Sequence, residues 1–421
     1  HPNHQFFIYL WLFKGCLYKP VYSWSSQMAS SARLLSAQIE EIASDARLQK
    51  DLEIMPANYN FEIPKTIWKI RNTGAKYVAL QFPEGLLLYA CVISDLLEKH
   101  TACETVIMGD VTYGACCVDD YTAVAMGCDL LVHYGHSCLV PIQNTDSISM
   151  LYVFVNIDIN LSHFIDCIRA NFPKNEKIAL VSTIQFIPSL QKAQRQLKEE
   201  GFCLFLPQAK PLSPGEVLGC TSARLPSDVK TSIYLGDGRF HLESSMLHNP
   251  DVTAFQYDPY SRKLTREVLD FDAIRKTRMG AISRLREGKG TLGLIQGSLG
   301  RQGNIKIVEE LERLLKAAGR PLIRITLSEI FPDKLRLMHH IDGYIQVACP
   351  RLSIDWGAFF PRPLLSPYEL AVALKQTKEP IDFYPMDFYA NDTLGPWGNN
   401  HGANRPVRER RKPRVVIQAQ S

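Results

Sequence analysis

The feature of this sequence that most constrains its fold is a block of alternating strand and helix patterns that occurs three times. Each block opens with a short apolar run, at Tyr77–Phe82, Ile178–Val181 and Leu292–Ile295, so the blocks start 101 and 114 residues apart. In each block a helical pattern follows this run, and a second apolar run follows the helix. Strands that alternate with helices predict parallel sheets covered on both faces. We therefore predict three copies of one α/β unit of about a hundred residues each.

A turn shared by the three blocks supports this repeat. A polar or Gly-bearing turn lies about 57 residues after each block begins, in the segments His133–His136, Gly236–His241 and Val347–Arg351. The alternative is that any doubly wound chain shows comparable strand spacings. The third block also contains a clear helical pattern over Ile305–Ala318, closed by Gly319 as its C-terminal stop. Four apolar residues share one face of that helix and are predicted to be buried: Ile305, Val308, Leu311 and Leu315.

These patterns divide the chain into five predicted parts. Residues 1–58 are an N-terminal extension with a helical arm, and residues 386–421 are a flexible basic tail. Between them lie three α/β repeats, at residues 59–160, 161–275 and 276–385. Met28 followed by small residues predicts a native start, which would make residues 1–27 an extension. The segment 31–55 has Leu and Ile at helical spacing and forms the predicted arm. Arginines gather over 405–414; such a run is usually solvated, and docking to nucleic acid or an acidic surface is the weaker alternative.

The composition excludes several classes of protein. With 46% hydrophobic and 21% charged residues, the chain has the balance of a globular protein and not of a disordered, collagenous or coiled-coil one. No apolar run reaches the roughly 18 residues of a membrane span. The net charge of +4 is too small to predict direct nucleic-acid binding. The apolar run Phe6–Phe13 has no basic residue before it, which favours a cytoplasmic protein over a secreted one. The eleven cysteines are then expected to be thiols or metal ligands and not disulfides.

Three turns, one in each repeat, carry a cysteine, and these are Cys116, Cys220 and Cys349. Ligands of open α/β sheets bind at the carboxyl ends of the strands. Three thiolates at a common centre could hold three irons of a four-iron cluster and leave the fourth iron open to a substrate. Zinc fits less well, because the chain contains no Cys-x-x-Cys pair. From the residues alone, each cysteine is more simply a buried core thiol.

The other cysteines have weaker claims on a metal. Cys117, which adjoins Cys116, and Cys138 fit either a ligand or a core thiol. Four more lie within apolar helix or strand patterns and are predicted to be core thiols: Cys91, Cys128, Cys167 and Cys203.

Around these turns the sequence is similar to a known family. Four segments closely resemble eukaryotic members of the diphthamide synthesis subunit 1/2 family: Gly109–Asp120, His133–Cys138, Gly236–His241 and Cys349–Gly357. The resemblance runs over residues 59–384. It implies three homologous parallel-sheet α/β domains in a pseudo-threefold arrangement, each giving one cysteine to a central [4Fe–4S] cluster: Cys116, Cys220 and Cys349. The second subunit of the family does not keep the full cysteine set, so this chain looks like a subunit 1.

The resemblance also implies an activity. Family members transfer the 3-amino-3-carboxypropyl group of S-adenosylmethionine, as a carbon radical released by reductive cleavage, to C2 of a histidine imidazole in translation elongation factor 2. This transfer opens diphthamide biosynthesis. It implies a heterodimer with the second subunit, a small electron-donor protein with its reductase, and no membrane or direct nucleic-acid partner. The Cys-x-x-x-Cys-x-x-Cys loop of the common radical enzymes is absent here, which agrees with the resemblance. A quinolinate-synthase-like dehydratase with the open iron as Lewis acid and a non-catalytic scaffold subunit are the alternatives.

Two turns are candidates for binding S-adenosylmethionine. The first follows a predicted strand and opens a helix, where backbone N–H groups hold anions, although such turns are also routine in α/β folds. Its candidate residues are Gly297, Ser298, Gly300, Arg301, Gln302 and Gly303. The second turn has glycines that let a ligand approach the backbone. Its candidate residues are Gly236, Asp237, Gly238, Arg239 and His241.

Three further polar residues have competing roles. Asp355 is a candidate contact to S-adenosylmethionine, and it could equally cap a helix or orient Arg351. His133 and His136 have side chains that bind metals in other proteins. Here we expect both histidines to make structural hydrogen bonds.

Overall fold

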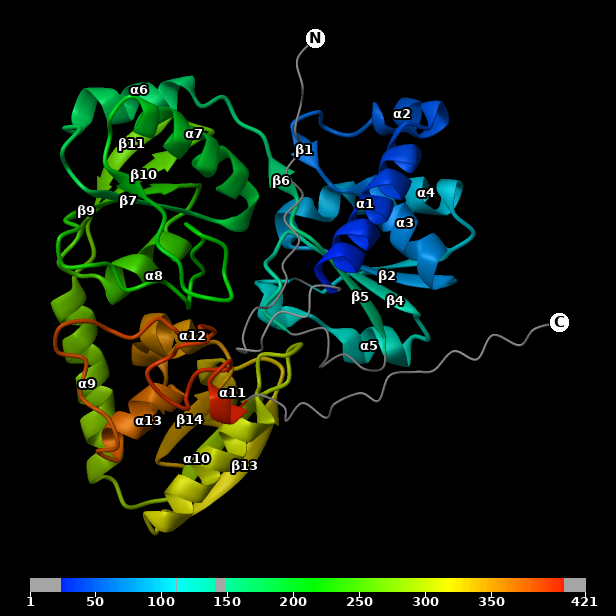
Figure 1. The fold of residues 1–421 in the computed structure, drawn as a ribbon. Coiled ribbons are helices and arrows are strands. Elements are labelled where there is room, and N and C mark those ends of the chain that lie inside the picture. The colour runs from blue at the N-terminus through cyan, green and yellow to red at the C-terminus, as the bar shows by residue number, and fades with distance from the viewer. Residues whose placement is uncertain (1–23, 111, 141–147, 405–421) are drawn as a thin grey trace.

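The structure is a computed structural model that describes residues 24–110, 112–140 and 148–404 of the chain. Within these residues the strands form three sheets of four or five strands and one small two-stranded sheet. The three large sheets occupy three lobes, coloured blue to cyan, green, and yellow to orange in Figure 1. The small sheet pairs β1 (Tyr59–Asn60) with β6 (Asn156–Ile157) in antiparallel orientation.

Each large sheet is built from consecutive strands of one repeat. The first contains β2 (Tyr77–Gln81), β3 (Glu104–Met108), β4 (Leu130–Tyr134) and β5 (Ser149–Val153). The second contains β7 (Ile178–Ser182), β8 (Leu204–Phe205), β9 (Thr231–Leu235), β10 (Thr253–Asp258) and β11 (Lys263–Glu267). The third contains β12 (Leu292–Gly297), β13 (Leu322–Leu327), β14 (Gly343–Val347) and β15 (Leu364–Leu365).

The three sheets have the same strand order. The orders are β3-β2-β4-β5, β8-β7-β9-β10 and β13-β12-β14-β15, and every pair within them is parallel. In the second sheet β11 extends this order as an antiparallel edge strand. The prediction of several parallel-sheet α/β units is therefore confirmed, and the repeated order supports their origin as copies of one unit.

Helices surround these sheets. In the first lobe they are α3 (Ile63–Thr73), α4 (Ala90–His100) and α5 (Asp120–Ala125), and in the second α6 (Ser162–Asn171), α7 (Ile187–Glu199) and α8 (Phe240–His248). The third lobe has α9 (Phe271–Glu287), α10 (Ile305–Ala317), α11 (Pro332–Arg336), α12 (Pro350–Trp356) and α13 (Pro367–Ala373). None of the helices in the described part of the chain is long and apolar enough to cross a lipid bilayer.

The predicted helical arm is present. It consists of α1 (Trp24–Ala43) and α2 (Ala46–Leu52), and Figure 1 shows both beside α3 and α4. Leu48 is buried in the core of the first lobe, and the Trp68 indole donates a hydrogen bond of 2.9 Å to Gln38. The predicted extension at residues 1–27 lies almost wholly outside the described residues, which begin at Trp24.

The buried face of α10 differs from the prediction in one residue. Five apolar residues of this helix are buried: Ile307, Val308, Leu311, Leu314 and Leu315. Ile305, which was predicted to share that face, is 45% exposed. The buried arc centres on Leu311, and at about 100° per residue Ile305 points roughly 120° away from it. The rest of the predicted stripe is correct.

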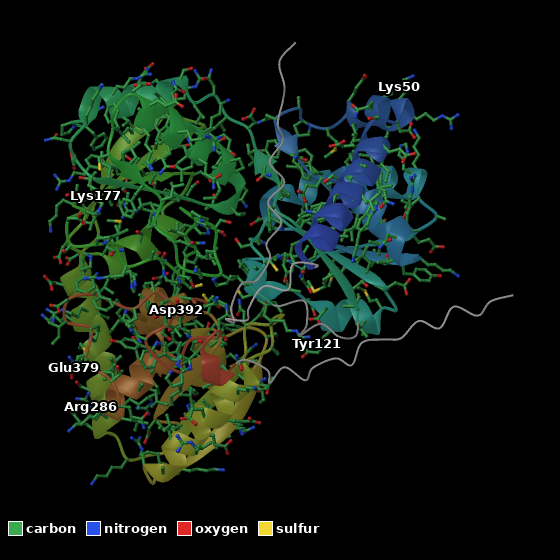
Figure 2. All side chains as sticks on the ribbon, in the orientation of Figure 1. Lys50, Tyr121, Lys177, Arg286, Glu379 and Asp392 are labelled. Atoms are coloured by element: carbon green, nitrogen blue, oxygen red, sulfur yellow. The ribbon has the colours of Figure 1, made fainter. Side chains whose placement is uncertain are left out.

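The part of the chain predicted to begin a flexible tail is folded. Met386, Phe388 and Tyr389 are buried, and Trp397 packs edge-on against Tyr368 of α13, with ring centroids 5.3 Å apart. Figure 2 places Asp392 beside the lobe that carries α12. Glycines and asparagines make this stretch look like a loop, but its aromatic side chains bury themselves against neighbouring repeats. Residues 386–404 are therefore not a tail, and the arginine-rich segment 405–414 lies outside the described residues.

Candidate functional site

The three predicted cysteines approach one another from three sheets. Cys116 lies in the 3-10 helix η2 (Ala115–Cys117) after β3, and Cys349 is the residue before α12, after β14. Cys220 lies in the long connection between β8 and β9, where Glu216 forms a parallel bridge with the last residue of β7. That bridge brings the turn to the carboxyl end of the strand, as expected for a ligand site of an open α/β sheet.

The electrostatics of these thiols indicate how near they lie. The pKa of Cys116 is raised well above its usual range by a hydrogen bond with Cys117, by burial, and by the charges of Cys220 and Cys349. Burial and the charge of Cys349 raise the pKa of Cys220 to about 12. Burial also raises the pKa of Cys349. The structure therefore brings the three predicted cysteines together, and their mutual influence keeps them as neutral thiols because the thiolate forms would repel one another.

This donor set fits an iron–sulfur cluster. A thiol becomes a metal ligand by losing its proton, and a cationic group must then offset the charges of three thiolates. Within the residues that the structure describes, no three His, Cys, Asp or Glu side chains converge closely enough to hold a single metal ion. A four-iron cluster is wider than one ion, so its cysteine ligands stand further apart. The role of these thiols as cluster ligands stays a prediction that the chemistry of the site supports.

Tyr389 completes this group and was missed in the sequence. It is buried, hydrogen-bonds to Cys116, and has a pKa raised well above its usual range by burial and by the charges of all three cysteines. Its neighbour Phe388 donates a backbone hydrogen bond of 3.3 Å to the carbonyl of Cys220, and the Tyr389 N–H donates one of 3.0 Å to Thr221. No local sequence signal marks this tyrosine, because its partners are distant along the chain.

Arg351 joins the turns that carry Cys220 and Cys349. Its guanidinium donates hydrogen bonds to the carbonyls of Gly219, at 3.1 Å, and Phe240, at 2.8 Å. It also pairs with Glu243 at 2.6 Å and lies over the Phe240 ring. The side chain is buried, and its positive charge lowers the pKa of both neighbouring cysteines against the stronger effect of burial. Arg351 therefore sets the position of one thiol relative to the other.

Asp355, a predicted contact to S-adenosylmethionine, also belongs to this junction. It accepts hydrogen bonds of 2.9 Å from Arg351, four residues earlier in α12. This contact agrees with the alternative that Asp355 orients Arg351, and a contact of Asp355 to S-adenosylmethionine stays a prediction.

The Gly-rich turn of the third repeat packs against the Cys116 turn of the first repeat and is hydrogen-bonded to it. The Arg301 N–H donates 2.8 Å to the Cys116 carbonyl, and its guanidinium pairs with Asp120 and stacks on Tyr121 at 3.9 Å. Gly300 has a φ of +53°, and a Cβ there would lie 2.5 Å from the backbone of Cys117, so only glycine fits this close approach. Figure 2 shows Tyr121 on the side of the first lobe that faces the third.

The remaining contact joins the first and second repeats. Ser137 donates a hydrogen bond to the buried carboxylate of Glu216, four residues before Cys220, and the Ser213 N–H donates a second one of 2.8 Å. Burial raises the pKa of Glu216. Each pair of repeats is thus joined by a polar contact close to one of the three cysteines.

A chain of hydrogen bonds runs from the Cys116 turn to the histidine turn of the first repeat. Gln81 donates 2.9 Å to the Cys117 carbonyl and accepts 2.8 Å from Nδ1 of His133. His133 Nε2 then accepts from Nδ1 of His136 at 3.3 Å. Burial lowers the pKa of His133 well below its usual range and that of His136 to about 4, with a contribution from His241. The hydrogen-bonding role expected for His133 and His136 is confirmed.

The two turns predicted to bind S-adenosylmethionine differ in how much of their polar surface is already used. In the Gly-rich turn, the N–H groups of Ser298, Arg301 and Gln302 all donate to carbonyls of the protein. In the second turn Arg239 is half-exposed and pairs with Glu267 at 2.8 Å. His241 is half-buried, and its pKa is lowered to about 4 by desolvation and by the charge of Arg351. The geometry favours the second turn for ligand binding and gives the first a role in joining repeats.

The cysteines predicted to be core thiols do not all lie in the core. Cys128 is buried, Cys167 is half-buried, and Cys91 and Cys203 are exposed. Cys91 lies on the outer face of α4 and Cys203 precedes β8, so each follows an apolar pattern without facing the sheet.

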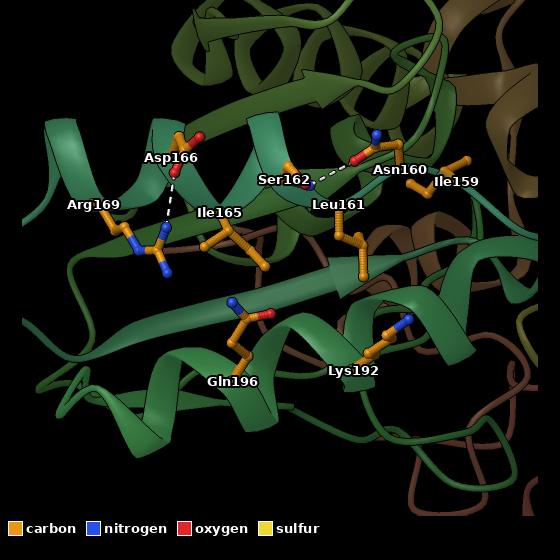
Figure 3. A pocket seen from close by; sticks show the side chains of 9 residues that line it. All are labelled: Ile159, Asn160, Leu161, Ser162, Ile165, Asp166, Arg169, Lys192 and Gln196. Carbon is orange, nitrogen blue, oxygen red and sulfur yellow. Dashed lines mark hydrogen bonds and ion pairs between the residues drawn. The ribbon is translucent and has the colours of Figure 1, made fainter. Parts of the chain in front are cut away.

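Two surface cavities lie away from the three cysteines. One of about 380 Å³ opens between α6 and α7 and is lined by Arg169, Lys192 and Gln196, among others; in Figure 3 Arg169 pairs with Asp166 at its edge. The other, of about 640 Å³, lies between the helical arm and α3 and is lined by Trp68. Neither is lined by a cysteine.

Comparison with known proteins identifies the family. A family model described as a putative diphthamide synthesis protein matches residues 82–385. The chain belongs to the diphthamide synthesis family. This match includes most of the first repeat, the whole of the other two and each of the three cysteines.

Relatives in this family share most of the chain. A protein of Caenorhabditis elegans named 2-(3-amino-3-carboxypropyl)histidine synthase subunit 1 is 63% identical over 94% of this chain and 100% of its own length. The human protein of that name is 56% identical over 87% of this chain and 83% of its own. These names confirm the predicted family and the prediction of an enzyme.

A solved structure shares the fold. The Dph2 protein of Pyrococcus horikoshii, solved with a 4Fe-4S cluster, is 25% identical, with a TM-score of 0.64 over 80% of this chain and 97% of its own. A protein of this fold thus holds the type of cluster that the cysteine set here suits.

Proposed function

We propose that this chain is the catalytic iron–sulfur subunit that transfers the 3-amino-3-carboxypropyl group of S-adenosylmethionine to C2 of a histidine imidazole in translation elongation factor 2. The observation that carries this proposal is the meeting of three thiols, one from each repeat, around Tyr389. The relatives named as subunit 1 of the synthase and the cluster in the archaeal structure support it.

In this proposal the three repeats stand in a pseudo-threefold arrangement about a [4Fe–4S] cluster held by Cys116, Cys220 and Cys349. The common strand order and the three polar contacts between repeats support that arrangement. When bound, such a cluster supplies the electron that breaks the bond from the sulfonium to the γ-carbon of methionine, which releases methylthioadenosine and a 3-amino-3-carboxypropyl radical. Arg351 and Arg301 hold the turns on either side of the thiols at a constant separation.

S-adenosylmethionine is proposed to bind at the two turns beside the cysteines. The second turn supplies the direct contacts, because its glycines let a ligand approach the backbone and His241 lies beside Arg351. The residues of this turn are Gly236, Asp237, Gly238, Arg239 and His241. The first turn and α12 are proposed to add further contacts: Gly297, Ser298, Gly300, Arg301, Gln302, Gly303 and Asp355. Burial keeps the His241 imidazole neutral, so it accepts or donates one hydrogen bond without repelling a sulfonium.

The proposal includes partners. "Subunit 1" in the names of the relatives supports a heterodimer with a second subunit of the family. Because one electron enters for each cleavage, a small electron-donor protein and its reductase are required. The reaction is placed in the cytoplasm, where elongation factor 2 acts.

Product analysis tests this function. The protein, purified without oxygen together with its second subunit and reconstituted with iron and sulfide, is reduced with dithionite and given S-adenosylmethionine. We expect methylthioadenosine only when the cluster is present and reduced, and a modified histidine when elongation factor 2 is added. Deoxyadenosine would show conventional radical cleavage instead. An intact, reducible cluster without any cleavage would favour a dehydratase that uses the open iron as a Lewis acid, and a colourless protein would favour a scaffold subunit.

A further inference from the structure

Exposed aromatic side chains gather at the turns that carry the three cysteines. Most of the aromatic residues that the described part of the chain exposes lie in or next to these turns: Tyr113, Tyr121, Phe240, Trp356 and Phe359. The others are Tyr77, Tyr260 and Phe331. Single exposed apolar side chains are normal on a protein surface, but a group of them at one site marks a place of interaction.

In the first repeat the exposed aromatic residue is Tyr113, three residues before Cys116. Its side chain is 72% exposed, although Thr112 before it and Ala115 after it are buried. The ring therefore projects from a packed turn and has no apolar surface of its own repeat to cover it.

In the second repeat the exposed aromatic residue is Phe240, the first residue of α8. Its ring packs on Gly219, the neighbour of Cys220, so closely that any side chain at Gly219 would collide with it. The Arg351 guanidinium lies 4.4 Å from the centre of the ring. These contacts fix the ring beside the Cys220 turn and still leave it 44% exposed.

In the third repeat two aromatic rings lie together at the end of α12. Trp356 and Phe359 are 58% and 66% exposed, and their ring centroids are 5.7 Å apart. Seven residues of helix carry Trp356 about 10 Å along the axis from Cys349. Its neighbour Asp355 accepts hydrogen bonds from Arg351, which ties this end of α12 to the Phe240 ring. Figure 1 shows α8 and α12 along the boundary between the second and third lobes.

We call these four side chains the aromatic rim: Tyr113, Phe240, Trp356 and Phe359. Each of the three repeats contributes to it, so the rim is wider than a small molecule and suits a protein. Tryptophan and tyrosine are also the residues that most often anchor protein–protein contacts, because their large rings bury much apolar surface at a low cost in conformational entropy.

The exposure of the cysteines favours a transient protein partner over a permanent one. Cys116, Cys220 and Cys349 are each only half-buried. In the proposed reaction a carbon radical has to meet the imidazole directly, because it would react with other groups on a longer path. The histidine must therefore reach the cysteines from outside, past the side chains that border their turns. A subunit bound permanently over the rim would close that approach.

We propose that the aromatic rim is the docking surface for the protein substrate, which presents its histidine on an exposed loop. Trp356 and Phe359 anchor the loop, and Tyr113 and Phe240 contact it from the other two repeats. The rim side chains carry no charge, and aromatic rings pack well against an imidazole and against apolar side chains of a loop. This inference rests on the proposed function, because it takes elongation factor 2 as the substrate, and it adds where that protein is held.

The test measures the affinity of the heterodimer for elongation factor 2 and the steady-state kinetics of histidine modification. In Trp356→Ala, Phe359→Ala and Tyr113→Ala, we expect the Kd to rise about tenfold or more, as for anchor residues of other interfaces. The KM for elongation factor 2 should rise with it, while kcat changes much less. Phe331→Ala is the matched control, because Phe331 is an exposed aromatic residue of the third repeat outside the rim, and it should leave the Kd as in the wild type.

The products and the subunit composition of the same samples separate the outcomes. An unchanged Kd and KM in both Trp356→Ala and Tyr113→Ala overturns the docking surface, while the modified histidine leaves the proposed function intact. Loss of the second subunit from purified Trp356→Ala would make the rim a subunit interface and also overturn the inference. If the wild-type heterodimer neither binds nor modifies elongation factor 2, the proposed function itself fails. Trp356 and Tyr113 lie in different repeats, so a folding defect in one variant leaves the other to decide.

Discussion

Replacing Arg351 with methionine removes the side chain that joins the Cys220 turn to the Cys349 turn. Methionine keeps most of the apolar stem, which packs on Phe240, while the guanidinium is lost. Two carbonyls then lose this donor, Asp355 loses its arginine partner, and Glu243 keeps only its longer contact with Arg239.

The size of the effect follows from burial. Breaking a buried ion pair by removing one partner costs about 3–5 kcal/mol. The Arg351 side chain is 4% exposed, but those of Glu243 and Asp355 are 24% and 28% exposed, so water can reach them once the arginine is gone. We therefore expect the low end of that range, about 3 kcal/mol.

Arg239 offers a matched control, since it pairs with the same Glu243 at 3.4 Å from a side chain that is 47% exposed. A surface pair of this kind contributes about 0–1 kcal/mol. The assay is urea unfolding of the cluster-free protein. With a slope of about 3 kcal/mol per molar urea, Arg351→Met should lower the midpoint by about 1 M and Arg239→Met by less than about 0.3 M. Equal midpoints for the two variants would refute the view that Arg351 holds the repeats together.

Three further predictions concern metal binding, pH and a buried ion pair. Alanine in place of Cys116, Cys220 or Cys349 should abolish iron binding after anaerobic reconstitution, whereas Cys167→Ala should retain it. Undiminished iron in any of the first three variants would remove that residue from the ligand set. Burial holds the pKa of His133 well below 6.5, so below that pH only the unfolded chain takes up a proton at this residue. The free energy of unfolding should therefore fall by up to about 1.4 kcal/mol for each pH unit below about 6.5. His133→Gln should make the urea midpoint change less between about pH 7 and about pH 5.5. Glu369→Gln should destabilise the protein by about 3–5 kcal/mol, because it leaves the fully buried Arg278 guanidinium unpaired; an unchanged thermal midpoint would contradict this.

Much of the fold follows from local patterns in the sequence. The apolar runs at the starts of the three blocks became β2, β7 and β12, which occupy equivalent places in their sheets. Such runs are visible because strand and helix periodicities involve only neighbouring residues. The same local reasoning failed for residues 386–404, whose burial depends on surfaces from two other repeats.

The cysteine site shows why spacing alone could not specify its geometry. Cys116 and Cys220 follow the second strands of their large sheets, β3 and β8, whereas Cys349 follows the third strand of its sheet, β14. Cys116 and Cys220 are 104 residues apart, and Cys220 and Cys349 are 129 residues apart. The second separation is longer because Cys349 lies in a later turn of its repeat. Contacts such as Arg351 with Gly219 join residues far apart in the chain, and no periodicity records them. The family motifs identified the three cysteines because they encode the outcome of that long-range packing.

The position of Tyr389 has a consequence for how the protein is made. A ribosome synthesises the chain from its N-terminus, so all three cysteines emerge before the segment that closes over them. Until residues 384–404 have emerged, the carbonyl of Cys220 has no Phe388 N–H to bond and Cys116 has no tyrosine beside it. Iron delivered during synthesis would meet an unfinished, water-filled site. If the proposed cluster is bound, its insertion is therefore expected to follow the release of this segment, as one of the last events in the maturation of the protein.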